Sequence, residues 1–345
     1  MMEERSYPSK SIQAALSNRN LELTIFPTEQ CNFRCTYCYE DFSTGKMTPE
    51  IIAGIKDLIT NRAADIENLR LGWFGGEPLL ALDVMLEISH HANEICEKFD
   101  VNLLPGQVTT NGFNLTLPVA QELIHLKQSE FQISLDGTAA SHDRTRKLIS
   151  GRGTFERIFE NILALKKSDL RFKILLRLHL LPHNVDSIEN LIETLSPLIE
   201  SDDRFCVLFK RVSNFGGPNA TEIDTLEHLH SEELITKFKP RLNRNGKLNP
   251  RELKQQGNYI CYASKPNSLL IRSNGSISKC TIALSDDFNI VGKLTSNGKI
   301  GFDATKMRSW MRGFESFSPE VLECPLNKFP EKEQAINFIP IKPAQ

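Results

Sequence analysis

Residues 21–38 read LELTIFPTEQCNFRCTYC and join a short candidate strand to a loop that carries three cysteines. Cys31, Cys35 and Cys38 have the spacing Cys-x3-Cys-x2-Cys. A closed zinc site normally has four ligands, and no paired Cys or His follows nearby. Three thiols on one short loop therefore favour an iron–sulfur cluster, which cysteines ligate, with one iron left open for chemistry.

The first two-thirds of the chain alternate candidate strands and candidate helices. The candidate strands cover 21–26, 69–74, 107–110, 131–135, 172–181 and 205–211. The candidate helices cover 48–64, 83–98, 118–127, 154–167 and 186–199. Alternating β and α elements indicate a parallel sheet with helices outside it. Six strands make either an incomplete barrel or an open doubly wound sheet.

The composition excludes several classes of protein. The chain has 345 residues, 40% hydrophobic and 24% charged, with a net charge of −2 at pH 7. No run approaches the ~18–20 apolar residues that cross a bilayer, and the near-zero charge does not favour a nucleic-acid partner. Residues 1–20 lack an apolar signal core. We therefore expect a cytoplasmic protein, in whose reducing environment clustered cysteines bind metal or do chemistry.

Unusual sequences follow four successive candidate strands at their carboxyl ends. After the cysteine loop come Gly75-Gly76-Glu77-Pro78, Thr110-Asn111-Gly112 and Ser134-Leu135-Asp136-Gly137. Each of these alone is ordinary turn sequence. Because ligands of parallel α/β folds bind at the carboxyl ends of strands, four in succession predict one binding site there.

Together these motifs resemble the radical S-adenosylmethionine (radical SAM) superfamily over residues 20–212. The resemblance implies an α/β fold, a partial (β/α)6 TIM-like barrel. It also implies a [4Fe–4S] cluster on the three cysteines, with the SAM amine and carboxylate on the fourth iron. Reduction, by a partner such as flavodoxin or ferredoxin, would cleave SAM to a 5′-deoxyadenosyl radical that abstracts a substrate hydrogen.

The resemblance also implies roles for individual residues in SAM binding. Gly75 and Gly76 let the backbone approach closely, and Glu77 beside them is expected to bind the methionyl amine. Ser134 and Arg146 match positions that hold the SAM carboxylate.

Two further positions have alternatives that the sequence leaves open. Tyr37 matches the aromatic position that contacts adenine, and simple loop packing is its alternative. Asn111 is expected near the ribose; for Asn111 and Asp136 the alternative is turn formation.

The fifth candidate strand separates apolar from charged residues. Its even positions, from Ile174 to Leu180, are apolar, whereas Arg177 and His179 stand at odd positions. A period of two puts these sets on opposite faces, so Arg177 and His179 are expected in the barrel lumen beside a polar cofactor. An internal salt bridge is the alternative. His179 and Asp136 are candidates for an acid or base.

Three later cysteines resemble part of the SPASM/twitch extension found in one branch of the superfamily. Thirteen residues stand between Cys261 and Gly275, and four stand between Gly275 and Cys280. Cys324 would be a later ligand, and Asn327 occupies the place of a fourth. We predict one auxiliary iron–sulfur cluster with an open or non-cysteine-ligated iron.

Two alternatives to this auxiliary cluster remain open, and two cysteines, Cys96 and Cys206, belong to neither group of three. The region holds no cluster, or a fourth ligand comes from elsewhere, with Cys206 as the candidate. Cys206 is otherwise a core thiol or a hydrogen-atom donor. Cys96 lies on a candidate helix among apolar residues and is expected to be a buried structural thiol.

These motifs divide the chain into five parts. They are an N-terminal segment (1–20), the partial barrel (21–212), a linker with a helix near 230–239 (213–257), a small α+β SPASM/twitch-like domain (258–330) and a tail (331–345). Hairpin turns are expected at Asn274-Gly275 and Asn297-Gly298.

Enzymes with such an extension mostly modify peptides or proteins; they include sulfatase-maturing enzymes and maturases of ribosomally made peptides, and residues 131–167 resemble this group. The resemblance therefore implies a peptide or protein substrate and a crosslink, oxidation or epimerisation as the product. The alternatives are a twitch-type dehydrogenase of a small molecule and a non-catalytic iron–sulfur sensor. Because few residues precede Leu21, we expect a peptide to dock on the barrel or the extension.

Overall fold

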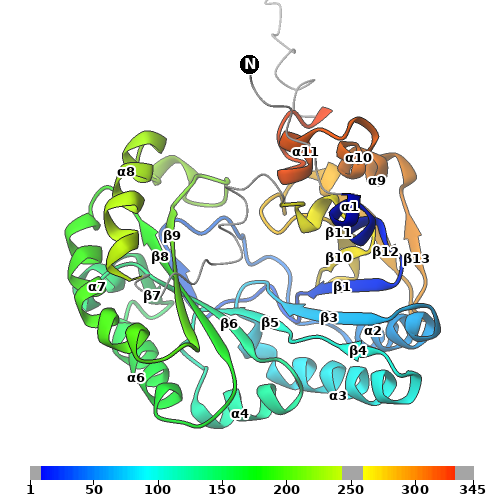
Figure 1. Ribbon diagram of the computed structural model, residues 1–345, viewed down its shortest axis with the longest axis horizontal. Helices are drawn as coiled ribbons and strands as arrows, with labels where there is room; N and C mark the ends of the chain where they lie inside the picture. The colour runs from blue at the N-terminus through cyan, green and yellow to red at the C-terminus, as the bar shows by residue number, and fades with distance from the viewer. Residues whose placement is uncertain (1–8, 243–258, 331–345) are drawn as a thin grey trace, which may run out of the picture.

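The computed structural model describes residues 9–242 and 259–330, and its centre is a curved sheet of parallel strands (Figure 1). Six strands run in the order β1-β3-β5-β6-β8-β9. Their bounds are β1 (Asn20–Ile25), β3 (Asn68–Trp73), β5 (Gln107–Thr110), β6 (Glu130–Leu135), β8 (Lys173–Leu180) and β9 (Phe205–Arg211). The short strand β4 (Asn102–Leu103) pairs with β3. This arrangement confirms the predicted partial (β/α)6 barrel.

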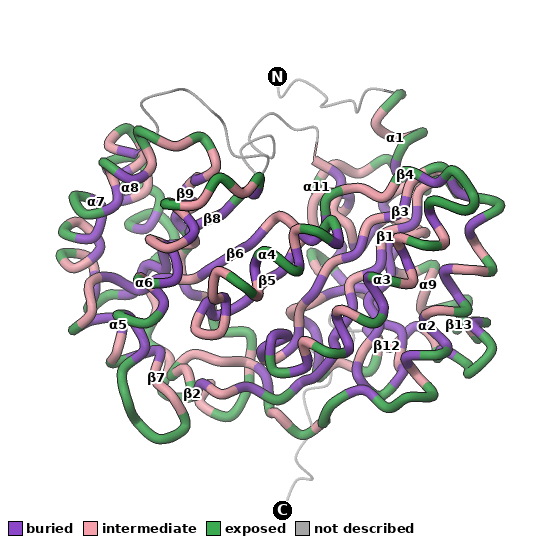
Figure 2. The backbone as a smooth tube through the Cα atoms, turned by 90° about the horizontal axis from the view of Figure 1, so that it is seen from below, coloured by how far each residue is buried: buried purple, intermediate pink, exposed green. Residues whose placement is uncertain are grey.

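Helices cover the outer face of this sheet, as the alternating pattern predicted. They are α2 (Pro49–Arg62), α3 (Leu82–Phe99), α4 (Leu117–His125), α6 (Phe155–Lys166) and α7 (Val185–Glu200). Strand β1 shows why the layers adhere: Leu21, Leu23 and Ile25 are at most 1% exposed, and Glu22 and Thr24 between them are only half-buried. Figure 2 shows the buried backbone running through the strands and the helix faces against them. Each such side chain contributes about 1.5–3 kcal/mol on burial.

The C-terminal region extends the same sheet. Strand β10 (Ser268–Ile271) pairs in parallel with β1, and β11 (Ser276–Ser278), β12 (Ile290–Leu294) and β13 (Ile300–Phe302) follow it antiparallel. Both predicted hairpin turns are present, with positive φ at Gly275 (80°) and Gly298 (73°). The 3-10 turns η6 (Tyr262–Ser264) and η7 (Asp287–Asn289) and helices α9 (Ala304–Met311), α10 (Gly313–Ser316) and α11 (Pro319–Glu323) complete this region.

The N-terminal helix α1 (Ser9–Leu16) packs on the C-terminal region. Its Ala15 joins Ile260 and Leu322 in one buried cluster. The predicted linker helix is α8 (His228–Phe238), flanked by the 3-10 turns η3 (Ala220–Glu222) and η4 (Lys239–Arg241). The polar stretch near 243–256 and the tail lie outside the described residues.

Two shorter pairings shape the mouth of the barrel. Strand β2 (Phe33–Cys35), inside the cysteine loop, pairs antiparallel with β7 (Arg146–Leu148). The turn η2 (Pro78–Ala81) follows β3, and helix α5 (Ala139–Thr145) precedes β7; η1 (Ala63–Asp65) extends α2. No helix in residues 9–242 or 259–330 combines the length and the apolar character needed to cross a membrane.

Candidate active site

The cysteine loop, residues 31–38, is anchored at the carboxyl end of β1. Cys35 stands opposite Arg146 in the β2–β7 pairing, and the amide of Thr36 donates to the Thr145 carbonyl at 3.0 Å. Burial raises the pKa of the Cys31 thiol, and the charges of Glu77, Cys35 and Cys38 raise it further. Burial likewise raises the pKa of Cys38 to about 12. The three thiols, here the first cysteine triad, therefore lie in one electrostatic neighbourhood.

The number and kind of these donor groups bear on the metal group that fits. Within the described residues, no three His, Cys, Asp or Glu side chains are gathered tightly enough for a single metal ion. A cubane of four irons is wider than one ion, so its cysteines stand further apart than the ligands of a mononuclear zinc. Three thiols on one loop match the cysteine ligation of an iron–sulfur cluster.

The predicted glycine pair lies directly against the backbone that leads into this loop. Gly75 has φ +106°, and a Cβ there would lie 2.3 Å from the Thr28 carbonyl oxygen. A Cβ on Gly76 would lie 2.5 Å from the Gln30 carbonyl oxygen, which also accepts the amide of Glu77 at 3.0 Å. Only glycine allows this approach, and it fixes Glu77 beside the first triad.

Glu77 is fully buried and almost saturated with hydrogen bonds. Its Oε1 accepts from the Leu79 amide at 3.1 Å and the Thr110 hydroxyl at 2.7 Å, and its Oε2 accepts from the Asn111 amide at 2.6 Å. A carboxylate offers about four acceptor positions, so one remains. Burial still raises the pKa of Glu77. A bound cation at the remaining position would stabilise the ionised form.

Asn111 makes the turn contact that was its alternative. Its Oδ1 accepts from the Phe113 amide at 3.0 Å, and its Nδ2 donates to Asn32 in the cysteine loop at 2.8 Å. The side chain therefore ties the end of β5 to the loop, and a role at the ribose stays a prediction.

Tyr37 is the centre of a buried polar cluster that joins the loop to β6 and β8. Its hydroxyl lies 2.7 Å from Asp136 Oδ2, 2.9 Å from His179 Nδ1 and 2.9 Å from Arg146 Nη1. Asp136 also accepts from the Thr145 hydroxyl at 2.6 Å. Tyr37 thus does more than pack in the loop. The predicted contact of its ring with adenine stays a prediction.

The protonation of this cluster follows from its contacts. Burial lowers the pKa of His179 to about 4, so its imidazole is neutral at pH 7. Burial raises the pKa of Asp136, but the hydrogen bond from His179 and the charge of Arg146 outweigh it and hold that pKa low. An ionised Asp136 3.1 Å from Nδ1 requires the proton of His179 on Nδ1. Nε2 is then the unprotonated nitrogen.

The predicted carboxylate-binding residues and Arg177 share this end of the sheet. Ser134 stands opposite Arg177 in the β6–β8 register. Ser134 lies two residues before Asp136, and Arg177 lies two residues before His179, so each shares a strand face with that residue. Arg146 is 8% exposed, and its Nε has no hydrogen-bond partner among the described residues. A buried guanidinium with an unused donor fits a bound carboxylate.

The three later cysteines also converge, and we name them the second cysteine triad: Cys261, Cys280 and Cys324. The Tyr262 hydroxyl accepts the Thr281 amide at 3.0 Å, which joins the first two, and the Cys261 amide donates to the Leu322 carbonyl, near Cys324. Burial raises the pKa of Cys280 to about 12, with Cys261 and Cys324 adding to the shift. These thiols fit a second cluster by the same chemistry.

Cys206 and Cys96 lie apart from the second triad, whereas the amide of Asn327 donates to the Cys324 carbonyl at 3.0 Å. Cys206 donates to the Ile174 carbonyl at 3.6 Å, and its charged neighbours are Lys173 and Glu130. The structure therefore does not bring Cys206 to the triad as a fourth ligand. Asn327 is bound through its Nδ2 to the Glu320 carbonyl at 3.5 Å. Cys96 is buried among apolar residues of α3.

One contact that the sequence analysis missed connects the two regions. Glu29, two residues before Cys31, is 3% exposed and forms an ion pair with Arg272. It also accepts from the Ser273 hydroxyl at 3.1 Å. Nothing in the local sequence signals this pairing, since 243 residues separate Glu29 from Arg272.

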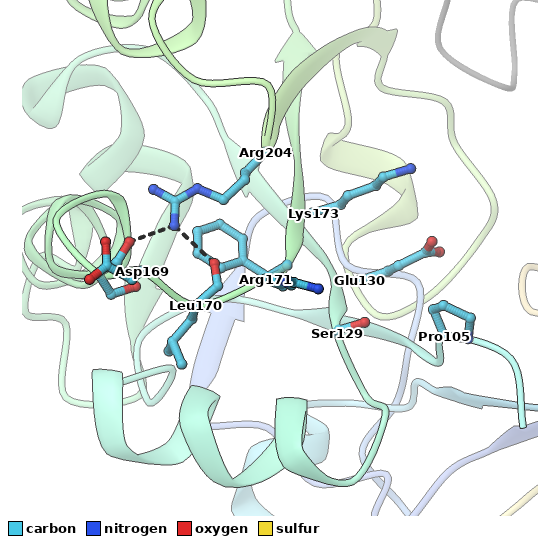
Figure 3. Close-up of a pocket in the computed structure, with 10 residues that line it drawn as sticks. Pro105, Ser129, Glu130, Asp169, Leu170, Arg171, Lys173 and Arg204 are labelled. Carbon is cyan, nitrogen blue, oxygen red and sulfur yellow. Dashed lines mark hydrogen bonds between the residues drawn. The ribbon is translucent and has the colours of Figure 1, made fainter.

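A cavity of about 580 Å³ lies away from these residues, at the amino ends of β6 and β8 (Figure 3). Glu130, Lys173 and Arg204 are among its lining residues, and Arg204 donates to the Leu170 carbonyl at 2.9 Å. Because the site occupies the carboxyl ends of the strands, this cavity belongs to the opposite face.

Comparisons with known proteins agree with this geometry. Residues 25–195 match the family model of the radical SAM superfamily. A cysteine-type anaerobic sulfatase-maturating enzyme of Clostridium novyi is 29% identical over 169 residues, 46% of this chain and 43% of the relative. A GTP 3′,8-cyclase of Rhizobium leguminosarum bv. trifolii is 30% identical over 162 residues, 44% of this chain and 42% of the relative. The chain thus spans less than half the length of these curated relatives.

Solved structures resemble a larger share of the chain. The anSMEcpe structure with bound AdoMet and Cp18Cys peptide has a TM-score of 0.60 at 19% identity, over 86% of this chain and 82% of that one. Streptococcus suis SuiB bound to the precursor peptide SuiA has a TM-score of 0.58 at 18% identity, over 93% of this chain and 73% of that one. At these identities the likeness shows the shared fold, including extra C-terminal strands and helices.

Proposed function

Residues 25–195 form a radical SAM domain, and from this premise we propose that the chain cleaves SAM reductively and abstracts a hydrogen from a peptide or protein. Domains of this superfamily use a [4Fe–4S] cluster together with SAM. When bound, that cluster supplies the electron that cleaves SAM. The first cysteine triad is our choice for its ligands.

The charges near the triad support the binding of an amino-acid group at this place. Glu77 keeps one acceptor position for an ammonium, and Arg146 keeps an unused donor for a carboxylate. Ser134 lies on the same strand face as Asp136, which belongs with Tyr37 and Arg146 to the buried polar cluster. This complementary pair of charges is the observation that carries the SAM-binding part of the proposal.

His179 is our candidate for the group that moves a proton. Asp136 orients the ring through Nδ1, which leaves Nε2 to accept a proton from the substrate. The pKa of His179, lowered to about 4 by burial, makes it a weak base in the structure described. Cys206 is a poorer candidate, because its thiol is engaged by a strand carbonyl.

The peptide part of the proposal is supported by the structural neighbours. Two of them, anSMEcpe and SuiB, were solved with peptides, and the likeness covers 86% and 93% of this chain, more than the family model matches. None of the eight cysteines, all within the described residues, forms a disulfide, which fits the reducing cytoplasm that we propose as its compartment.

A small-molecule substrate is the second candidate, because GTP 3′,8-cyclases match the chain as well as the maturating enzyme does. The two are separated by the rate of 5′-deoxyadenosine formation in anaerobically reconstituted protein. The reductant is dithionite, or flavodoxin, our proposed partner. A pool of cysteine- and serine-containing peptides is compared with GTP. Acceleration by peptides alone supports the proposal, and acceleration by GTP alone contradicts it.

A further inference from the structure

Lys279 is a cation enclosed in the C-terminal region. Its side chain is 0% exposed, and its Nζ donates to the carbonyl oxygens of Lys265 at 2.5 Å and Ser268 at 2.6 Å. Among the described residues no carboxylate lies within ion-pair distance of it; Glu22, the acidic residue that acts on it, pairs with Lys265. A buried charge without a counter-charge is costly, so this burial calls for an anion.

The contacts of Lys279 place it close to two members of the second triad, Cys261 and Cys280, and the charge of Cys261 acts on its ammonium. Lys265, whose carbonyl it binds, ends the turn that begins at Cys261: the Ser264 amide donates to the Cys261 carbonyl at 3.0 Å. Cys280 is the next residue in the chain. The amides of Lys279 and Cys280 both donate to Asn289 Oδ1, at 3.1 and 2.9 Å.

Asn289 holds this segment rigidly from the other side as well. It is 0% exposed, and its Nδ2 donates to the carbonyls of Cys280 and Ala283, both at 2.9 Å. With backbone and ammonium both fixed, Lys279 cannot swing out to solvent without breaking these bonds. Its Nζ therefore keeps a fixed position in the segment that carries Cys261 and Cys280.

We propose that Lys279 is the built-in counter-cation of an auxiliary cluster on Cys261, Cys280 and Cys324, and that it raises the reduction potential of that cluster. This inference rests on the proposed function and on the auxiliary cluster predicted for the second triad. Thiolate ligands give such a cluster a negative charge, and reduction adds one more electron. A fixed cation nearby stabilises the reduced state more than the oxidised state.

The test is a redox titration of the full reconstituted chain, followed by electron paramagnetic resonance, with iron counted per chain. Lys279→Met keeps the length of the side chain and removes the charge, whereas Lys279→Arg keeps the charge. Lys306→Met is the matched control, because Lys306 also donates to a backbone carbonyl, that of Asp287 at 2.7 Å, but is only half-buried. The first-triad cluster, recognised by its response to SAM, is the internal reference.

We expect Lys279→Met to shift the oxidised-to-reduced ratio of the auxiliary cluster at a fixed potential at least tenfold toward the oxidised form, ~59 mV for one electron. The same ratio should change less than threefold for the auxiliary cluster in Lys279→Arg and in Lys306→Met. It should also change less than threefold for the first-triad cluster in Lys279→Met. The proposal is also supported if Lys279→Met loses about four irons per chain and Lys279→Arg keeps them. An unchanged ratio, or equal iron loss in both Lys279 variants, overturns it.

Failure here is distinguishable from failure of the proposed function. Wild-type protein with about four irons that still forms 5′-deoxyadenosine lacks the auxiliary cluster, which overturns only the role of Lys279. Protein with both clusters that forms none contradicts the proposed function, and the potentials of its clusters still test Lys279.

Discussion

The hydroxyl of Tyr37 offers a sharp test of how the cysteine loop is held. Tyr37→Phe keeps the ring but removes the contacts with Asp136, His179 and Arg146. Hydrogen bonds to charged groups contribute about 1.5–3 kcal/mol each. Asp136 keeps its bond from Thr145 at 2.6 Å, whereas Arg146 Nη1 loses its acceptor inside the protein. We therefore expect the variant to lower the free energy of unfolding by about 2–4 kcal/mol.

The assay is urea unfolding of the cluster-free protein at pH 7 under reducing conditions, with Tyr39→Phe as the matched control. Tyr39 lies in the same segment, and its hydroxyl has no hydrogen-bond partner among the described residues. Loss of the Tyr39 hydroxyl should change the free energy of unfolding by less than about 0.5 kcal/mol. In a double-mutant cycle with Asp136→Asn, we expect a coupling energy above about 1 kcal/mol. The reasoning is refuted if Tyr37→Phe costs no more than Tyr39→Phe.

Three further predictions concern single positions. Gly217→Ala should lower the urea midpoint more than Gly216→Ala: both have φ +91°, but only at Gly217 would a Cβ meet the Cys38 carbonyl oxygen, at 2.6 Å; equal effects would contradict the contact. Glu77→Gln should raise the KM for SAM at least tenfold with iron content unchanged, because its NH2 would face a backbone N–H; an unaltered KM would argue against the assigned role. Burial lowers the pKa of His142 to about 4, so stability is lost as pH falls from about 6.5 to 4. His142→Gln should therefore destabilise less at pH 4.5 than at pH 7 in urea unfolding, and an equal cost would show no such shift.

The partial barrel could be predicted from the sequence because each of its strands is encoded by a short stretch of the chain. Each strand of the partial barrel, from β1 to β9, is a short apolar run bounded by turn residues, and its neighbour in the sheet is usually the next strand along the chain. The first cysteine triad lies within one loop, so its spacing alone indicated cluster chemistry. Each of the six predicted strands of the partial barrel begins in the structure within one residue of its predicted first residue.

Contacts between distant segments were not readable in the same way. The Tyr37 hydroxyl bonds to residues 99 and 142 positions away, and strand β10 joins β1 in parallel although the linker lies between them. Such pairings depend on how the sheet curves, which a local pattern does not encode. The SPASM/twitch-like boundaries at 258–330 therefore stay a prediction, and the strands within them continue the barrel sheet.

The most direct test of the central claim is 5′-deoxyadenosine formation by the reconstituted chain. Wild-type protein, SAM and dithionite are mixed without oxygen, and the product is measured by mass spectrometry beside Cys35→Ala. We predict product from the wild type, and from Cys35→Ala neither product nor the absorbance of the first-triad cluster. No product from a fully loaded wild type, or equal product from Cys35→Ala, would contradict the claim.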